Sequence, residues 1–141
     1  MALRVLVTAP YMQPVIGRFR HRFDEHGIEL VVPPVNERMS EAELLAWVGD
    51  IDGVIAGDDQ FTERVLRATP RLKVLSKWGT GIDSFDQNAC RRLGVAIRNT
   101  PDAFSQPVAD SVLGYVVCLL RQLPAMDRAV RANEWSKKPQ G

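Results

Sequence analysis

Five short apolar segments alternate with helix-like stretches over the first hundred residues, and this alternation constrains the fold more than any other feature. Short β-branched and apolar runs of this kind predict buried strands, and strands joined by helices form a parallel sheet through right-handed crossovers. We therefore predict an α/β fold, a flavodoxin-like five-stranded parallel sheet with helices on both faces and strand order 2-1-3-4-5. The predicted strands lie within residues 3–8, 28–33, 52–57, 71–77 and 95–99.

The segments between these strands carry signals for helix starts and ends. Ser40 and Glu43 have the spacing of a capping box, in which each side chain bonds the backbone N–H of the other residue. The helix near residue 61 can be capped by Thr62, or alternatively by Asp58 or Asp59. The predicted helices cover residues 15–26, ended by Gly27; a segment opening at Ser40; residues 61–68; and residues 86–93, ended by Gly94.

A long apolar helix is predicted to follow the sheet, from about Ser105, interrupted by Pro124 and resuming toward Trp135. Its most apolar part, residues 112–120, is too short to span a bilayer and favours a buried helix. We expect a sheet domain over residues 1–101 and a helical segment over residues 102–141. Because the helix is apolar nearly all round, we also expect a homodimer that pairs through residues 105–123.

The composition is that of an ordinary globular protein, with 45% hydrophobic and 25% charged residues. The net charge is +1, from 18 basic and 17 acidic residues, so we expect no nucleic-acid partner and no membrane partner. The two cysteines, Cys90 and Cys118, belong to no C-x-x-C pair, and we expect buried, reduced thiols in a cytoplasmic protein. No metal site is expected.

The stretch "SKWGTGIDSFD" follows the fourth predicted strand, at the sheet edge where ligands bind in open α/β folds. It is a poor dinucleotide fingerprint, because Ser84 occupies the place of the third glycine and the helix starts late. Gly79 and Gly81 can instead turn backbone N–H groups toward an anion such as a carboxylate, with Lys77 supplying positive charge. The alternative, that the two glycines only shape a tight turn, stays open.

The residues from about 72 to 135 resemble the D-isomer-specific 2-hydroxyacid dehydrogenases, a family that includes phosphoglycerate dehydrogenases and glyoxylate/hydroxypyruvate reductases. Residues 1–70 resemble the family only in architecture. The resemblance rests on an ordered run: a basic residue after an apolar strand, G-x-G-x-D, a short helix, N-x-P, and a helix opening with a V-A-acid motif. These are Lys77, Gly79-Thr80-Gly81-Ile82-Asp83, Asn99-Thr100-Pro101 and Val108-Ala109-Asp110.

The resemblance implies a substrate-binding domain for a small 2-oxo or 2-hydroxy acid, followed by a hinge toward a Rossmann domain that binds NAD or NADP. Intact members transfer hydride between the nicotinamide and the C2 carbon of the acid, with a histidine and an arginine as catalytic groups. Thr80 is expected beside the nicotinamide and is the one cofactor-binding residue. The implied substrate-binding residues are Lys77, Trp78, Gly79, Thr80 and Gly81.

Three positions depart from the family pattern. Asp110 stands where glutamate is usual, and an acid in the first turn of a helix also has a purely structural explanation, since it interacts favourably with the helix dipole. Phe104 replaces a polar residue that contacts substrate in some members. Trp78 is bulkier than the small residue common there and narrows or caps the site.

The family's G-x-G-x-x-G motif and its catalytic arginine, acid and histidine do not occur in this sequence. Its histidines, His21 and His26, lie at or near the first predicted helix, and we assign no catalytic residue. We therefore expect a truncated, catalytically silent chain that binds no cofactor tightly. The alternative is a stand-alone binding or dimerisation module of receiver-like architecture, favoured by Asp58 and Asp59 after the third strand.

Overall fold

The structure is a computed structural model and describes residues 2–135. The chain divides into two compact units, Met1–Pro101 and Asp102–Gly141, and each unit is described here by itself.

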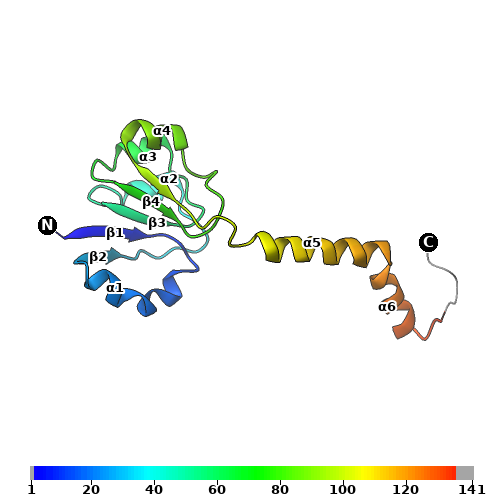
Figure 1. The fold of residues 1–141 in the computed structure, drawn as a ribbon. Coiled ribbons are helices and arrows are strands. Elements are labelled where there is room, and N and C mark those ends of the chain that lie inside the picture. The colour runs from blue at the N-terminus through cyan, green and yellow to red at the C-terminus, as the bar shows by residue number, and fades with distance from the viewer. Residues whose placement is uncertain (1, 136–141) are drawn as a thin grey trace. The chain divides into compact units, whose positions relative to one another are not determined.

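The first unit is built on a five-stranded sheet in which every neighbouring pair of strands is parallel (Figure 1). The strand order is β2-β1-β3-β4-β5, which confirms the predicted fold and order. The register pairs Val54 of β3 with Leu75 of β4, and Leu75 with Ile97 of β5. The strands are β1 (Leu3–Val7), β2 (Ile28–Val31), β3 (Gly53–Ala56), β4 (Val74–Lys77) and β5 (Ala96–Arg98).

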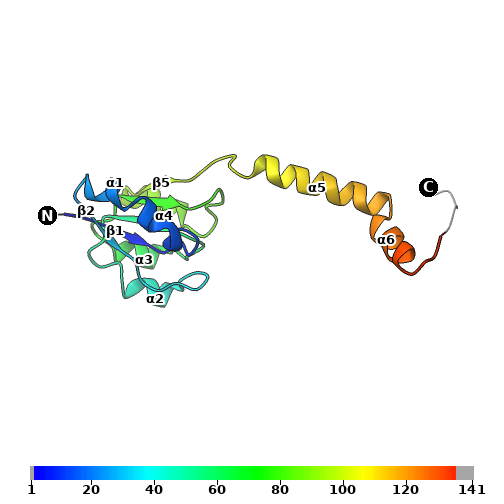
Figure 2. The same cartoon turned by 90° about the horizontal axis from the view of Figure 1, so that it is seen from below.

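Helices cover both faces of this sheet, and each face has its own core. Helices α2 (Glu41–Leu45), α3 (Glu63–Arg67) and α4 (Gln87–Leu93) pack on one face, over a core that includes Leu6, Leu75 and Val65. The 3₁₀ helix η1 (Gln13–Arg18) and helix α1 (Arg20–Asp24) cover the other face, over a smaller cluster. Figure 2 shows α1 and α2 on opposite sides of the sheet.

The capping signals in the sequence position these short helices as expected. The capping box of Ser40 and Glu43 is present, with both reciprocal hydrogen bonds. Of the three candidates for the cap of α3, the structure selects Thr62, whose hydroxyl accepts from the Val65 N–H. Helix α4 ends at Gly94 in the left-handed conformation, as predicted.

The predicted single helix over residues 15–26 is wrong. The chain forms η1 and α1 instead, with Phe19 between them outside both helices. Neither segment has a side-chain cap at its start, and Pro14 and Gly17 lie within the first. Pro14 is in the first turn, where proline is tolerated, whereas Gly17 disfavours a regular α-helix because glycine loses more backbone entropy.

The second unit consists of α5 (Ser105–Leu120) and α6 (Leu123–Arg131), which are bent by 58° with respect to each other. The break comes before Pro124, where Gln122 adopts a left-handed conformation with φ of 52°. Asp110 lies in the second turn of α5, so its predicted place in the first turn is wrong; it accepts a hydrogen bond from the Gln106 amide at 2.7 Å.

The apolar residues of α5 are exposed in this unit, and their burial through pairing with a second chain stays a prediction. Cys118 is partly exposed and Cys90 is buried, and neither forms a disulfide. Among residues 2–135 no single helix has the length and apolar composition to cross a membrane. The bent pair α5 and α6 meets those two criteria only when both helices are taken together.

Candidate functional site

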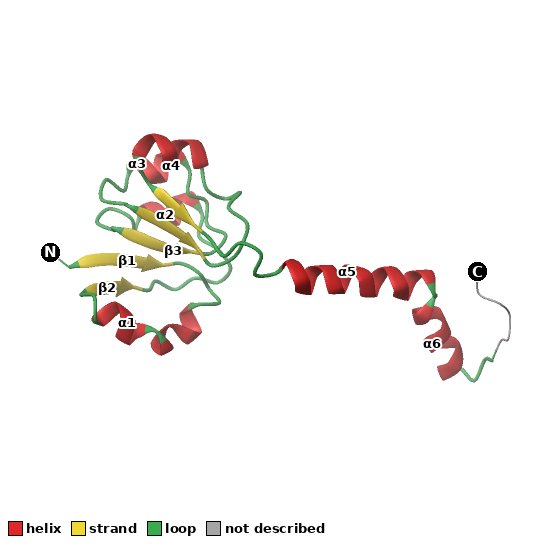
Figure 3. Cartoon of the chain, in the orientation of Figure 1, coloured by secondary structure: helices red, strands yellow, loops and turns green. Residues whose placement is uncertain are grey.

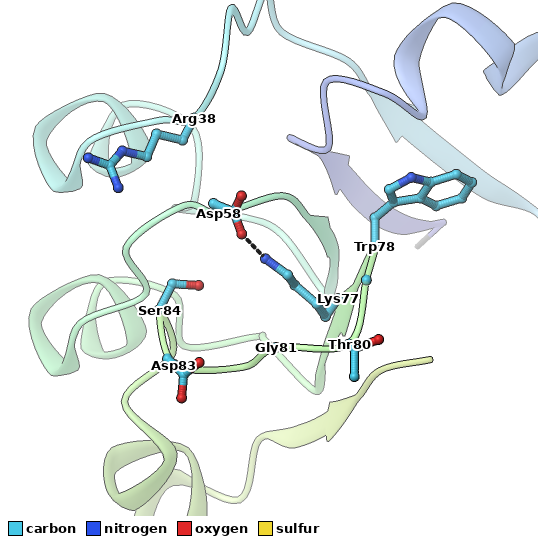
Figure 4. Close-up of a pocket in the computed structure, with 9 residues that line it drawn as sticks. Arg38, Asp58, Lys77, Trp78, Thr80, Gly81, Asp83 and Ser84 are labelled. Carbon is cyan, nitrogen blue, oxygen red and sulfur yellow. Dashed lines mark hydrogen bonds and ion pairs between the residues drawn. The ribbon is translucent and has the colours of Figure 1, made fainter. Parts of the chain in front are cut away.

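A pocket of about 420 Å³ lies at the sheet edge where the parallel strands end. Figure 3 shows the strands in yellow and the loops that leave them in green. The loops after β3 and β4 and the segment before α2 contribute to it. All five residues predicted to bind substrate line this pocket, and their role stays a prediction. The lining residues are Arg38, Asp58, Lys77, Trp78, Gly79, Thr80, Gly81, Asp83 and Ser84 (Figure 4).

The glycine loop is tied to the segment that follows β5. The Thr100 N–H donates to the Gly79 carbonyl at 3.0 Å, and the Thr80 hydroxyl donates to the Thr100 carbonyl at 3.0 Å. The Asn99 amide donates to the Thr80 carbonyl at 2.7 Å. Gly79 has φ of 146°, a conformation that residues with a Cβ rarely adopt. The loop therefore has a fixed shape, with two of its carbonyls already bonded.

The unpaired polar groups of this loop include three backbone donors. Within residues 2–135, none of the Gly79, Thr80 and Gly81 N–H groups donates a hydrogen bond to the protein. Ser84 Oγ is buried at the pocket, and it is the one buried side-chain N or O atom of the described chain without a partner. Buried polar groups are nearly always satisfied, so an unpaired hydroxyl in the same pocket as unpaired amides favours an anionic or polar ligand.

Lys77 lines the pocket as predicted, but its charge is already paired. Its side chain is only 6% exposed. The ammonium group donates to the Gly57 carbonyl at 2.6 Å and forms an ion pair with Asp58, whose side chain is 79% exposed. Lys77 is therefore not the free cation that the sequence suggested.

Trp78 leaves the strand on a different side from Lys77, as Figure 4 shows. Its side chain is exposed, and its backbone N–H donates to the Ala56 carbonyl at 2.8 Å, which extends the pairing of β3 and β4 by one residue. The indole thus flanks the pocket at its rim.

Asp59 fixes the neighbouring loops around the pocket. This carboxylate is fully buried and accepts from the Thr8 hydroxyl at 2.5 Å, the Met39 N–H at 2.6 Å and the Gly57 N–H at 3.0 Å. It connects the end of β1, the segment that carries Arg38 and the end of β3. Asp59 is therefore structural, and it is not a helix cap as the sequence allowed.

The position of Ser84 is set by two phenylalanines. Phe61 donates its N–H to the Ser84 carbonyl at 3.1 Å, and Asp86 donates its N–H to the Phe61 carbonyl at 2.9 Å. The rings of Phe61 and Phe85 pack edge to face with centroids 5.6 Å apart. The end of the glycine loop is therefore held by the core.

Four lining residues were not predicted as site residues: Arg38, Asp58, Asp83 and Ser84. Asp58 and Asp83 lie at or just beyond the carboxyl ends of β3 and β4, so the strand-end rule points to both. Arg38 had no sequence signal, because its place depends on the hydrogen bond between Met39 and Asp59. The sequence drew attention to Ser84 only because it occupies the position of the third glycine in a dinucleotide fingerprint.

The two aspartates that suggested a receiver-like module do not form an acidic cluster. Asp58 pairs with Lys77, and Asp59 is enclosed by three donors. Among residues 2–135, no group of three or more His, Cys, Asp or Glu side chains could hold a metal ion. Burial, aided by the charge of Asp86, raises the pKa of the Cys90 thiol, which keeps this group protonated.

The first unit is thus an open α/β sheet with a glycine loop and a pocket at the carboxyl ends of its strands. The sequence profile described as "D-isomer specific 2-hydroxyacid dehydrogenase, catalytic domain" matches residues 5–134. The chain belongs to this family of NAD-dependent D-2-hydroxyacid dehydrogenases, which confirms the resemblance seen in the sequence.

Individual relatives agree with this family. A glyoxylate/hydroxypyruvate reductase of Arabidopsis thaliana is 42% identical over 84 residues, which is 60% of this chain and 26% of the relative. A D-3-phosphoglycerate dehydrogenase of Sus scrofa is 30% identical over 120 residues, 84% of this chain and 22% of the relative. The chain thus spans about a quarter of the length of these relatives.

A solved structure shows the same fold. The D-lactate dehydrogenase of Aquifex aeolicus, crystallised with NAD and lactic acid, superposes with a TM-score of 0.77 at 17% identity. The match covers 96% of this chain and 39% of that protein.

Proposed function

We propose that this chain is the N-terminal, substrate-side part of an NAD(P)-dependent D-2-hydroxyacid dehydrogenase, and that the loop from Lys77 to Gly81 binds the carboxylate of a small 2-oxo acid. The observation that carries this proposal is the set of three unpaired N–H groups at Gly79, Thr80 and Gly81, in the pocket that the unpaired Ser84 hydroxyl also lines.

The geometry of the loop suits a carboxylate. Successive backbone donors around a concavity bind an anion without adding a formal charge that would have to be buried. The hydrogen bonds from Asn99 and Thr100 hold the loop in place, so little entropy is lost when a ligand binds. The role of this chain is then to hold and orient the acid, and a bound nicotinamide supplies or accepts the hydride.

The 141-residue chain by itself is proposed to be inactive. Its sequence contains no G-x-G-x-x-G motif, and its two histidines, His21 and His26, lie on or just after α1, away from the pocket lining. Mixing the chain with NADH and glyoxylate, hydroxypyruvate or pyruvate is expected to give no oxidation of NADH. Turnover by the purified chain would contradict this proposal.

Carboxylate binding can be tested by NMR titration of the labelled chain with glyoxylate. The amide resonances of Gly79, Thr80 and Gly81 are expected to shift in a saturable manner, whereas those of Gly17 and Gly27, which lie outside the pocket, stay in place. Neutral acetaldehyde serves as the matched ligand without a carboxylate and is expected to cause no such shifts. If glyoxylate leaves the three loop amides unmoved, the proposed function is wrong.

We also propose that the chain forms a homodimer through residues 105–123. This is favoured by the exposed apolar side chains of α5, among them Val112, Val116 and Leu120. Sedimentation is expected to show a dimer at micromolar concentration and a monomer for Val116→Asp. Ser111→Asp, at an exposed polar position of the same helix, is the control and is expected to remain dimeric. A wild-type monomer would overturn this proposal.

A further inference from the structure

We propose that Asp58 is a specificity-determining residue that restricts the site to 2-oxo acids with an uncharged substituent and disfavours those with a second anionic group such as a phosphate ester. This inference rests on the proposed function, because it assumes that the glycine loop holds the carboxylate of the acid.

The first support is the state of Lys77. A buried lysine at a pocket is an obvious partner for a phosphate, but this ammonium is bonded to the Gly57 carbonyl and paired with Asp58 (Figure 4). Two of its three N–H donors are therefore already used. A phosphate would have to displace Asp58 before it gained the full charge of Lys77.

The second support is the exposure of the two partners. The Lys77 side chain is 6% exposed and that of Asp58 is 79% exposed. The lysine side chain is thus buried, whereas the aspartate carboxylate is exposed to solvent. An anionic substituent that approaches this part of the pocket meets the aspartate, which repels it.

The third support is the charge balance of the lining. Arg38 and Lys77 are basic, Asp58 and Asp83 are acidic, and the other lining residues carry no formal charge, so the sum is zero. A single carboxylate can be bound by the free loop amides. A phosphate adds roughly two negative charges, and this lining has no surplus of cationic side chains to balance them.

The two kinds of relative described above differ in the charge of the acids they are named for. The phosphoglycerate dehydrogenases are named for a phosphorylated acid, and the glyoxylate/hydroxypyruvate reductases for acids without a phosphate. The pairing of Asp58 with Lys77 places this chain with substrates of the second kind.

The test measures a ratio of affinities in the 141-residue chain. Hydroxypyruvate and its 3-phosphate ester are titrated at low ionic strength, with the Gly79, Thr80 and Gly81 amides as the NMR readout. Wild type is expected to bind hydroxypyruvate at least as tightly as the ester. Asp58→Asn is expected to shift the ratio toward the ester by about tenfold, an effect that weakens with added salt. Asn keeps an oxygen that can accept from Lys77, and because this side chain is exposed the denaturation midpoint is expected to match that of wild type.

Two control variants separate a specific effect from a general one. Asp83→Asn also removes one negative charge from the pocket, but Asp83 is not the partner of Lys77. The ratio of affinities is expected to shift by less than about threefold. Asp24→Asn, on α1 and outside the pocket, is expected to leave the ratio unchanged.

Several results would overturn the inference. A wild-type preference for the ester would show that Arg38 or Lys77 binds the phosphate despite Asp58. An equal shift in Asp58→Asn and Asp83→Asn, or no shift in Asp58→Asn, would remove Asp58 as the determinant while hydroxypyruvate binding upholds the proposed function. If neither acid moves the loop amides, the proposed function and this inference fail together.

Discussion

The two units of the chain differ in the exposure of their apolar side chains. In the first unit, side chains such as Leu6, Leu75 and Phe61 are fully buried between the sheet and its helices. In the second unit, α5 carries a comparable density of apolar residues, yet none of its side chains is buried. The first unit therefore buries its own apolar side chains, whereas the second unit by itself leaves those of α5 exposed and available for contacts with another surface.

This difference shows where local sequence patterns are sufficient. Periodicity identifies an apolar helix or strand, but it does not say what covers it. In the first unit the covering elements come from the same hundred residues, so the pattern and the burial agree. In the second unit the same kind of pattern predicts a helix that is buried by pairing between chains, and the covering surface is not part of the unit itself.

The largest expected effect is on the free energy of unfolding, and it is tested by truncating one leucine in each unit. Leu6→Ala removes a fully buried side chain and is expected to lower the free energy of unfolding by about 3 kcal/mol. Leu119→Ala removes a side chain that is 72% exposed and is expected to change it by less than about 0.5 kcal/mol. Urea denaturation at low protein concentration measures both. Equal losses would contradict the contrast between the units.

A second prediction concerns the loops of the first unit. Asp59→Asn replaces an oxygen that accepts from Thr8 and Gly57, or the one that accepts from Met39, by an NH₂ group. Buried donors are then left unpaired, and the free energy of unfolding is expected to fall by about 2 kcal/mol. The exposed Asp83→Asn is the control and is expected to stay within about 0.5 kcal/mol of wild type. If Asp59→Asn leaves the free energy of unfolding unchanged, the pocket loops do not depend on this carboxylate.

Much of the first unit follows from its sequence, because its signals are local. Strand alternation predicts the sheet, and the capping residues Ser40 and Thr62 place the starts of two helices. The broken helix before Gly27 was missed because apolar spacing is insensitive to the absence of a cap. The break at Gln122 was anticipated only through Pro124.

The pocket was only partly predictable, because its missing residues are placed by long-range contacts. The sequence predicted the glycine loop from the spacing of its glycines and its position after a strand. Arg38 reaches the pocket through a hydrogen bond between residues 20 positions apart, from Met39 to Asp59. The pairing of Lys77 with Asp58 spans 19 positions, and no local pattern shows that the lysine has a partner.

A third prediction tests an ion pair at the amino-terminal side of the sheet. Asp52 accepts from the Arg4 N–H at 2.9 Å and from the Arg71 guanidinium, and these bonds hold its pKa below the ordinary value. A lowered pKa means that the stabilisation is complete above the unfolded-state pKa and is lost as the pH falls through the folded-state value. Asp52→Asn is expected to cost about 1.5 kcal/mol at neutral pH.

The pH dependence links this prediction to the ionised carboxylate of Asp52 in the first unit. The difference in unfolding free energy between wild type and Asp52→Asn is expected to shrink as the pH falls below about 4. Urea titrations at a series of pH values measure it, with Asp24→Asn, an exposed acid of α1, as the control. A difference that stays constant down to strongly acidic pH would rule out the bonded carboxylate as its source.

The smallest expected effect on stability has the clearest consequence for the site. Gly79→Ala places a Cβ on a residue with φ of 146°, where space is available but the backbone conformation is strained. A loss of about 1 kcal/mol in unfolding free energy is expected, whereas Gly17→Ala, in open space with no such φ, loses none. If the loop relaxes to relieve the strain, its N–H groups turn away from the pocket, and glyoxylate should no longer shift the Thr80 and Gly81 amides. Full binding by Gly79→Ala would show that the glycine only shapes a turn, which is the alternative the sequence left open.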